Sequence, residues 1–266
     1  MSSEEAYEEL SEMMDIQSFI DYYCSMIYID NYDWLPDNAI CWRSIAKGSH
    51  EKEDGKWRWA IWDTEGGENS YERNTFKSGN IICWEEDPIV RGLMQNDSFR
   101  KEFVVSFMDL VNNNFEEERV SAVIDKILEE YQFSYELNRI RYLGERDTSK
   151  YADAIKDFFC NRSKYIVSFL KEEFELWEDP VYIALLIDKE NVAEFSVNTI
   201  SLEKDCAFWQ GIYFNDYPVT LSVNEIASDA QFEGWYTEDG TLISTERKIE
   251  IELGSETKII HARFKE

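Results

Sequence analysis

The stretch IDNYDWLPDN, residues 29–38, and the stretch WRWAIWDTE, residues 57–65, decide the fold of this chain. The first is a polar loop in which Asp33 and Asn38 stand five positions apart. The second alternates bulky apolar residues with others, as a half-buried β-strand does. It stops at Asp63, where an acidic, glycine-containing segment begins. The two stretches therefore predict a polar loop and a β-strand that ends in acidic residues.

The residues on either side predict a mainly helical region that contains a β-hairpin. Residues 39–43 form a short apolar run that would pair with residues 56–62, leaving residues 44–55 as a polar connection. Residues 4–29 predict a helix, because apolar side chains recur at intervals of three and four. Three further helices are predicted downstream, and their apolar faces are expected to form core. Those faces consist of Phe99, Phe103, Phe107, Leu110 and Val111; of Phe115, Val120, Val123, Ile124, Ile127 and Leu128; and of Ile155, Phe158, Phe159, Tyr165, Ile166, Phe169, Leu170 and Phe174.

After Pro180 the apolar period changes from helical to two, the period of a strand. Val219, Leu221 and Val223 alternate with polar residues, and glycines separate the short runs. We therefore predict two domains, a helical one over residues 1–190 and a small all-β module over residues 191–266. The expected fold class is α+β: a mainly helical region with a short β-hairpin, followed by a small all-β C-terminal module.

Composition narrows the classes of function. The 266 residues hold 27 Lys and Arg against 55 Asp and Glu, which gives a formal net charge of −28. Nucleic-acid backbones and anionic membranes are bound by clustered Lys and Arg, so direct binding to either is disfavoured. A hydrophobic content of 44% argues against a disordered chain. No apolar run reaches the roughly 18 residues of a membrane span, and the first residues lack the pattern of a signal peptide.

The cysteines and histidines are scattered. They give no spacing typical of a zinc site or of a dense disulfide framework, so we expect mostly buried, structural thiols. A Ser-His-Asp triad is poorly supported, because the histidines are far apart in the sequence. The residues are Cys24, Cys41, Cys83, Cys160, Cys206, His50 and His261.

The spacing of Asp33, Asn38 and Asp63 suits phosphoryl transfer. In protein kinases a loop Asp accepts the proton of the substrate hydroxyl, an Asn five positions later holds a metal ion, and an Asp at a strand end bridges metal and nucleotide. Mg²⁺ prefers oxygen ligands and keeps several waters, so one carbonyl and one carboxylate can suffice. The same spacing has a simpler alternative, in which Asp33 and Asn38 are turn or capping residues.

The wider context resembles the CotH family, atypical protein kinases related to spore-coat protein H. The resemblance is carried by a helix followed in order by residues 29–34, Asn38, residues 41–43 and residues 55–65, and it includes their order, their spacing and the surrounding tryptophans. The predicted helices downstream fit the same family. The resemblance covers about residues 10–178 and implies a kinase-like C-terminal lobe.

That resemblance assigns roles to six residues. Asp33 would be the catalytic residue at the substrate hydroxyl. Asp63 would hold Mg²⁺ together with Asn38 and Glu65, and Asn31 and Asn38 would contact the cofactor; Asp30 would line the same loop. The family often has Asp where Glu65 stands, and a Glu carboxylate reaches one methylene further. The implied cofactors are Mg²⁺ and ATP, and the implied reaction transfers the γ-phosphate to Ser or Thr of a protein.

We expect the nucleotide-binding lobe to be absent. Residues 1–32 contain no Gly, Lys or Arg, whereas a lobe that cradles ATP phosphates needs a Lys and a covering loop. The chain is thus expected to be a C-terminal portion that is inactive alone or needs a partner supplying that lobe.

The region from residue 195 to residue 264 resembles small β-repeat modules of bacterial surface proteins. The sequences GIYF at 211–214, YPVTLSV at 217–223 and FEGW at 232–235 carry this resemblance. It implies an extracellular or envelope location. The resemblance to the CotH family adds the cell surface or spore coat as a location, and a protein substrate or a spore-coat or cell-surface protein as partner. The side chains expected to face one core are Val219, Leu221, Val223, Phe232 and Trp235.

Two other classes of function stay open. Abundant Trp and many carboxylates also suit a carbohydrate-binding or carbohydrate-active protein, in which Asp63 and Glu65 would share one side of a strand. A non-catalytic adhesion or scaffold protein could keep the fold and use its acidic surface.

Overall fold

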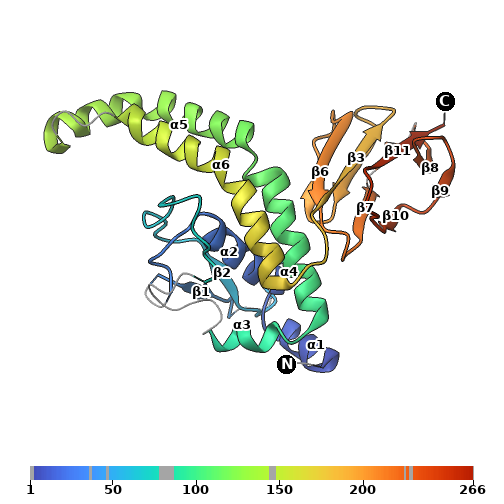
Figure 1. The fold of residues 1–266 in the computed structure, drawn as a ribbon, viewed down its shortest axis with the longest axis horizontal. Coiled ribbons are helices and arrows are strands. Elements are labelled where there is room, and N and C mark those ends of the chain that lie inside the picture. Colours follow the sequence, from blue (N-terminus) through green and yellow to red (C-terminus); the bar gives the residue numbers. More distant parts are fainter. Residues whose placement is uncertain are drawn as a thin grey trace. The chain divides into compact units, whose positions relative to one another are not determined.

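The computed structural model describes residues 3–35, 38–45, 48–77, 87–143, 148–224, 226–227 and 230–265. Its contacts divide the chain into two units. The first comprises Met1–Arg100 and Asn113–Leu170, and the second comprises Lys101–Asn112 and Lys171–Glu266. Over the described residues, the first unit is mainly helical with a short hairpin and the second is mainly β (Figure 1). This confirms the α+β class expected from the sequence.

Two helices stand where the sequence predicted one continuous helix. α1 spans Glu4–Met13 and α2 spans Ile16–Tyr28. The helical hydrogen bonding is interrupted between them because the Trp57 backbone forms hydrogen bonds with Met13 and Asp15. Its amide donates to the Met13 carbonyl at 2.9 Å, and its carbonyl accepts from the Asp15 amide at 2.9 Å. Asp15 is also the N-cap of α2, so a long-range contact and a cap together override the continuous helical period.

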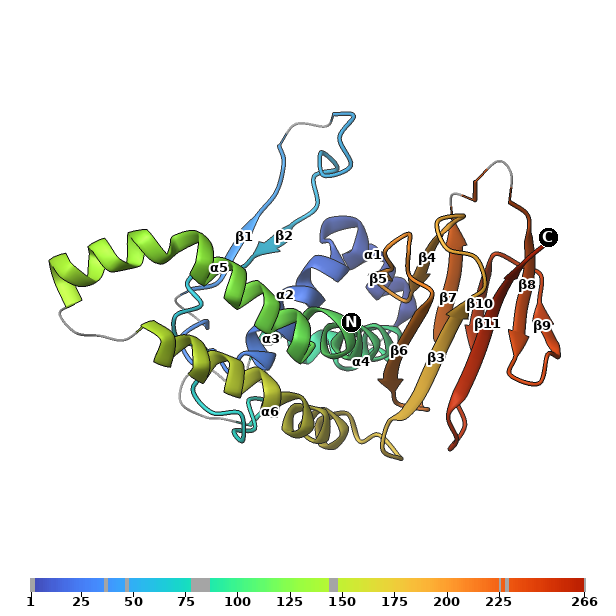
Figure 2. The same ribbon diagram turned by 90° about the horizontal axis from the view of Figure 1, so that it is seen from above.

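The predicted hairpin is confirmed, with shorter strands than expected. β1 (Ile40–Trp42) pairs antiparallel with β2 (Arg58–Ala60), and the hairpin extends away from α2 (Figure 2). The Trp59 amide donates to the Ser18 hydroxyl at 3.0 Å. The Phe19 ring meets the Trp59 ring edge-on, with centroids 4.9 Å apart. β2 is therefore fixed against the first turns of α2.

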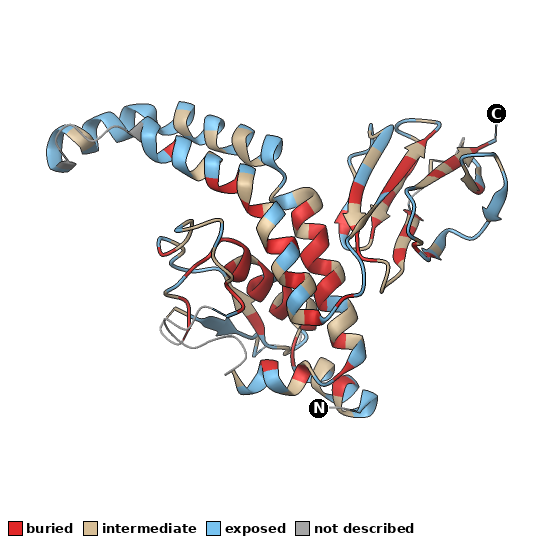
Figure 3. Ribbon diagram, in the orientation of Figure 1, coloured by how far each residue is buried: buried red, intermediate tan, exposed pale blue. Residues whose placement is uncertain are grey.

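α2 forms the centre of the core of the first unit (Figure 3). Phe19 is fully buried and packs near Phe99, which lies at the start of the helix α4, Asp97–Asp109. The short helix α3 spans Pro88–Leu93, and a π-helical turn at Leu110–Asn114 follows α4. Of the predicted face, Phe99, Phe103, Phe107 and Val111 are buried, whereas Leu110 is only partly covered.

α5 is exposed, which corrects the expectation that its apolar face forms core. It spans Glu117–Asn138, continues into a π-helical turn at Arg139–Leu143, and runs alongside α6, Thr148–Phe174 (Figure 1). Val123 is 50% exposed and Ile127 is 43% exposed. The helical period was right, but an apolar stripe carries no information on whether another element covers it.

The strands of the second unit form two sheets within the described residues. The larger sheet has the order β6-β3-β11-β8-β9, and the smaller has the order β10-β7-β4-β5. β3 and β11 are parallel, and the other pairs are antiparallel. The strands are β3 (Val181–Ile187), β4 (Glu194–Val197), β5 (Ile200–Ser201), β6 (Phe208–Tyr213), β7 (Val219–Asn224), β8 (Phe232–Thr237), β9 (Leu242–Ser244), β10 (Lys248–Ile251) and β11 (Lys258–Phe264).

The two sheets share one aromatic core. Phe195 of the smaller sheet meets Trp235 and Phe264 of the larger sheet edge-on, at centroid distances of 6.2 and 6.1 Å. The residues expected to face this core are buried, except that Phe232 is only partly covered.

The boundary expected at residue 190 falls inside this arrangement. β3 lies before that boundary, yet it pairs with both β6 and β11 of the larger sheet. Asp109, at the end of α4, also belongs to the second unit: its carboxylate accepts from the Tyr213 hydroxyl at 2.6 Å and from the Thr199 amide at 2.9 Å. Whether residues 1–190 and 191–266 fold independently stays a prediction.

The thiols are not uniformly buried. Cys24 is buried, whereas Cys41 and Cys160 are exposed, which corrects the expectation for those two. Cys206 is partly covered, and Cys83 lies outside the described residues. Over the described part of the chain, every helix is too short or too polar to cross a bilayer.

Candidate active site

Asn31 joins the loop that follows α2 to the segment that follows β2. Its Oδ1 accepts a hydrogen bond from the Asp33 amide at 3.1 Å, and its Nδ2 donates to the Asp63 carbonyl at 3.3 Å. Asn31 is buried, with 1% of its surface exposed. The backbones of Asp33 and Asp63, which the hairpin separates in sequence, therefore lie on either side of one buried amide group.

Asp33 and Asn38 close the polar loop. The Asn38 Nδ2 donates to the Asp33 carbonyl at 2.8 Å and to Asp33 Oδ2 at 3.3 Å. The Asn38 amide donates to the Trp34 carbonyl at 3.1 Å, and the Trp34 ring is buried against Tyr23. The five-residue spacing thus corresponds to a direct contact between the two side chains. The same bonds also give Asn38 the turn-forming role that the simpler alternative assigned to it.

Asp63 and Glu65 present exposed side chains after β2. Asp63 adopts a φ of 52°, in the left-handed region that Asp tolerates better than most residues. Its carbonyl is held by Asn31, so the strained residue is fixed from inside the protein. Two carboxylates are therefore accessible from solvent beside the Asp33 loop.

Gly66 allows the two segments to approach closely. The Tyr32 amide donates to the Gly66 carbonyl at 3.2 Å. A Cβ at position 66 would lie 2.7 Å from Asn31 Oδ1 and 3.2 Å from the Asp33 Cβ. A side chain at this position would therefore push against the amide that joins the loops. From the sequence alone, Gly66 is one residue of the polar segment that ends the strand, and its packing role is not evident.

Asp30 is turned into the protein rather than along the open loop. It is 1% exposed and forms an ion pair with Arg73, with 2.6 Å between Oδ2 and the guanidinium, and it accepts from the Ser70 amide at 3.0 Å. Burial raises the pKa of the Asp30 carboxyl, and the Arg73 guanidinium acts in the opposite direction. The structure thus gives Asp30 a contact with the 70–73 segment.

Arg162 on α6 is the supporting residue that sequence reasoning missed. Its side chain is fully buried, and its guanidinium donates to the carbonyls of Tyr28 at 2.8 Å, Tyr71 at 2.9 Å and Arg73 at 2.7 Å. Burial lowers its pKa to about 10, so it is charged at neutral pH. It therefore ties the end of α2 to the segment after Gly66. Arg162 lies four positions after Phe158, on the buried side of α6, and this helical spacing is the sequence feature that could have identified it.

Glu68 is a second residue that the sequence did not single out. Its amide donates to the Ile29 carbonyl at 2.6 Å, and its φ is 52°. Burial raises the pKa of its carboxyl to about 7. A carboxyl that titrates near neutral pH thus lies in the segment packed against the loop.

The donor chemistry of the site fits Mg²⁺. The carboxylates of Asp33, Asp63 and Glu65 and the side-chain oxygen of Asn38 are hard oxygen donors, and Asp63 and Glu65 are open to solvent. Among the described residues, no three acidic, His or Cys side chains converge into a ready-made cluster. A site of one or two carboxylates completed by waters and phosphate oxygens is the type that Mg²⁺ uses with nucleotides.

Comparison with known proteins identifies one family. A family model described as CotH kinase protein matches residues 1–166, which include the Asp33 loop, the hairpin, Asp63 and Arg162. The match ends before the second unit's strands, so the resemblance of that region to β-repeat modules stays a prediction. Neither the curated proteins nor the solved structures gave a significant match.

Proposed function

The chain belongs to the CotH kinase protein family, and we propose that, alone or together with a partner that supplies the nucleotide-binding lobe, it transfers the γ-phosphoryl group of ATP to a Ser or Thr hydroxyl of a protein. The observation that carries this proposal is the Asn31 side chain, which holds the Asp33 loop and the Asp63 segment on its two sides. Phosphoryl transfer depends mainly on positioning and charge neutralisation, so a buried group that fixes both segments is the part such a site needs.

Asp33 is the proposed catalytic residue. Its carboxylate takes the proton of the substrate hydroxyl as the oxygen attacks phosphorus. Asn38 orients this carboxylate through its 3.3 Å bond to Oδ2, and Asn31 fixes the backbone of the same residue. The partly exposed position of Asp33 leaves it accessible to a hydroxyl.

Asp63, Glu65 and Asn38 are the proposed ligands of Mg²⁺, and Asn38 lines the cofactor side of the loop. Asn31, which the resemblance also places at the cofactor, is buried and would support the loop through its bonds to Asp33 and Asp63. When bound, Mg²⁺ and ATP supply the phosphoryl group and a cation that neutralises its charge during transfer. The chain's own contribution is to keep Asp63 in its left-handed conformation and Asn38 against Asp33. The longer reach of Glu65 suits a ligand that approaches from solvent.

The acceptor is proposed to be a protein of the spore coat or cell surface. Family membership links the chain to spore-coat proteins, and the proposed β-repeat character of the second unit supports a surface setting. The strong negative charge favours an acceptor with basic segments.

A phosphoryl-transfer assay tests this function. The full chain, alone and with a candidate partner protein that supplies a nucleotide-binding lobe, is incubated with Mg²⁺, γ-labelled ATP and a basic protein acceptor. Phosphoserine and phosphothreonine are identified by mass spectrometry. Nucleotide binding is followed in parallel by calorimetry with and without Mg²⁺. Asp33→Asn should lower transfer by roughly a hundredfold or more, since a positioned base contributes that much. Asp63→Asn should abolish the Mg²⁺ dependence of nucleotide binding.

Asp153→Asn, an exposed acid on α6, is the matched control and should leave both measurements unchanged. The proposal fails if neither transfer nor Mg²⁺-dependent nucleotide binding is found. It also fails if transfer survives unchanged in both the Asp33 and Asp63 variants. Tight oligosaccharide binding with no nucleotide binding would instead favour a carbohydrate-binding protein.

A further inference from the structure

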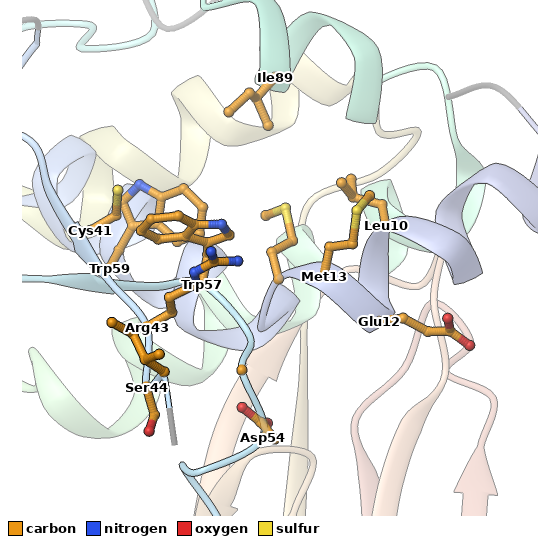
Figure 4. A pocket seen from close by; sticks show the side chains of 13 residues that line it. Leu10, Glu12, Met13, Cys41, Arg43, Ser44, Asp54, Trp57, Trp59 and Ile89 are labelled. Carbon is orange, nitrogen blue, oxygen red and sulfur yellow. The ribbon is translucent and has the colours of Figure 1, made fainter. Parts of the chain in front are cut away.

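A cavity of about 730 Å³ lies between α1, the β1–β2 hairpin and α3 (Figure 4). Trp57 and Trp59 form one wall, Met13 lies across from them, and Ile89 borders the cavity above. This volume lies within the range of ligand sites in proteins. The cavity is lined mainly by apolar side chains that come from three separate elements.

The apolar lining of this cavity is open to solvent. Met13 is 58% exposed, Ile45 is 96% exposed and Trp57 is 39% exposed, and all three border the same hollow. Apolar side chains scattered singly on a surface need no explanation, but a group that meets around a cavity is typical of a binding site. Met side chains are flexible and adapt to different apolar partners.

The rim of the cavity on the α1 side is acidic. Glu5, Glu9 and Glu12 follow one another at intervals of four and three, so they lie on one side of α1 next to Met13. No Lys or Arg occurs in α1. Glu12 lines the cavity, and the glutamates of α1 give this rim a negative potential.

The hairpin side carries a different charge. The Arg43 guanidinium lies 4.9 Å above the Trp57 ring, on the wall opposite Glu12 (Figure 4). Asp54 on the same side is already paired with Arg58, through bonds of 2.8 and 2.9 Å. The cavity is therefore negatively charged along α1 and positively charged at Arg43. This difference would orient a charged ligand that binds in it.

We propose that this cavity docks a peptide segment of the acceptor protein in which a large apolar side chain stands next to Lys or Arg. The apolar side chain enters between Met13 and Trp57, and the basic residues lie along the glutamates of α1. The net charge of −28 disfavours small anionic ligands and favours a basic partner. The identification of this peptide with the acceptor rests on the proposed function, whereas the binding itself does not.

The docking cavity is separate from the candidate active site. Asn38 and Asp63 flank the open end of the hairpin, whereas Arg43 and Asp54 lie toward its connecting end. The same two strands thus carry the active-site segments at one end and border the cavity at the other. A peptide held here would add to the affinity of an acceptor without touching the residues that react.

Peptide binding to the full chain in the absence of nucleotide tests this inference. The probe is a short fluorescein-labelled peptide of arginines followed by leucines, and binding is followed by fluorescence anisotropy. Two control peptides carry glycines in place of the leucines or glutamates in place of the arginines. Each control is expected to bind at least about tenfold more weakly, since each loses one of the two recognition elements. Equal binding of the glycine peptide would overturn the inference.

Matched variants separate docking from general attraction to an acidic protein. Met13→Ser and Glu9→Lys should each weaken binding severalfold, whereas Ile127→Ser and Glu129→Lys on the exposed face of α5 should not. Thermal unfolding of each variant shows that it is folded. The proposal would be refuted if the α5 variants weakened peptide binding as much as the cavity variants do. It would also be refuted if anilinonaphthalene sulfonate bound the cavity more tightly than the peptide does. Asp33→Asn should leave peptide binding intact. If the unaltered chain binds the peptide but shows no phosphoryl transfer, that result counts against the proposed function only.

Discussion

Arg162 on α6 donates from Nε to the carbonyl of Tyr28, the last residue of α2, over 2.8 Å. This bond crosses the core of the first unit and ends where the candidate active-site loop begins. The same guanidinium reaches the carbonyls of Tyr71 and Arg73. A single buried cation therefore satisfies a carbonyl at the end of α2 and two carbonyls in the 71–73 segment, which has no regular secondary structure of its own.

We predict that Arg162→Met destabilises the protein by at least about 3 kcal/mol, because it leaves several buried carbonyls without donors. Arg162→Lys should recover only part of this loss, since an ammonium group cannot reach carbonyls on two sides in the way a guanidinium does. Urea unfolding measures both. Lys164→Met, an exposed position on the same helix, is the control. A loss for Arg162→Met no larger than that of the control would contradict this role.

Gly66→Ala should disturb the active-site loop. The added methyl group would meet Asn31 Oδ1 at 2.7 Å, so Asn31 must shift and loosen its bonds to Asp33 and Asp63. We expect a loss of about 1–3 kcal/mol in stability, as for other overpacked sites, and a fall in phosphoryl transfer. Gly254→Ala, where a Cβ meets nothing within 4 Å, should change neither. Wild-type behaviour of both variants would show that the close approach is dispensable.

The raised pKa of the Glu68 carboxyl leads us to predict that the stability of the protein depends on pH. Burial raises the pKa of its carboxyl from 4.5 to about 7. The folded state therefore holds a proton that the unfolded state releases in this interval, so the stabilising contribution is complete below pH 4.5 and is lost as the pH rises toward 7. Glu68→Gln should flatten the slope of stability against pH over this window. Glu129→Gln, an exposed Glu on α5, should not. Chemical unfolding at a series of pH values measures the slopes, and parallel slopes for Glu68→Gln and wild type would exclude the assignment.

The contact of Asp109 with the β-sheet unit is expected to stabilise that unit. Tyr213→Phe removes one 2.6 Å bond and should cost about 1–2 kcal/mol. Asp109→Ala should cost more, because it also leaves Thr199 and Asn198 without their acceptor. Tyr182→Phe, at a hydroxyl on an exposed side chain, is the control. Thermal unfolding followed by tryptophan fluorescence reports the three variants, and a smaller effect for Asp109→Ala than for Tyr213→Phe would be inconsistent with the shared carboxylate.

The hairpin and the Asp33 loop could be predicted from the sequence because they depend on local patterns. Alternation over residues 56–62 identifies a strand, and the spacing of Asp33 and Asn38 corresponds to a direct contact. These features are determined by residues close together in the chain, so a single sequence contains the information.

Other features depend on contacts between distant segments. The helix break at Asp15 follows from the position of Trp57, and the burial of Arg162 follows from the carbonyls that surround it. Val123 is exposed because no described element covers that side of α5. A periodicity gives the side of a helix that is apolar, but it does not identify the partner of that side, so these features could not be predicted.

The parallel pairing of β3 with β11 has a consequence for the order in which the second unit can form. Ile183 on β3 pairs with Lys258 on β11, and β11 stands between β3 and β8 in the larger sheet. During synthesis β3 emerges from the ribosome long before its parallel partner β11, so the sheet stays incomplete until residues 258–264 have been translated. Ile183 and Leu185, which are fully buried in the finished sheet, are then the side chains that a chaperone is expected to meet on the nascent chain.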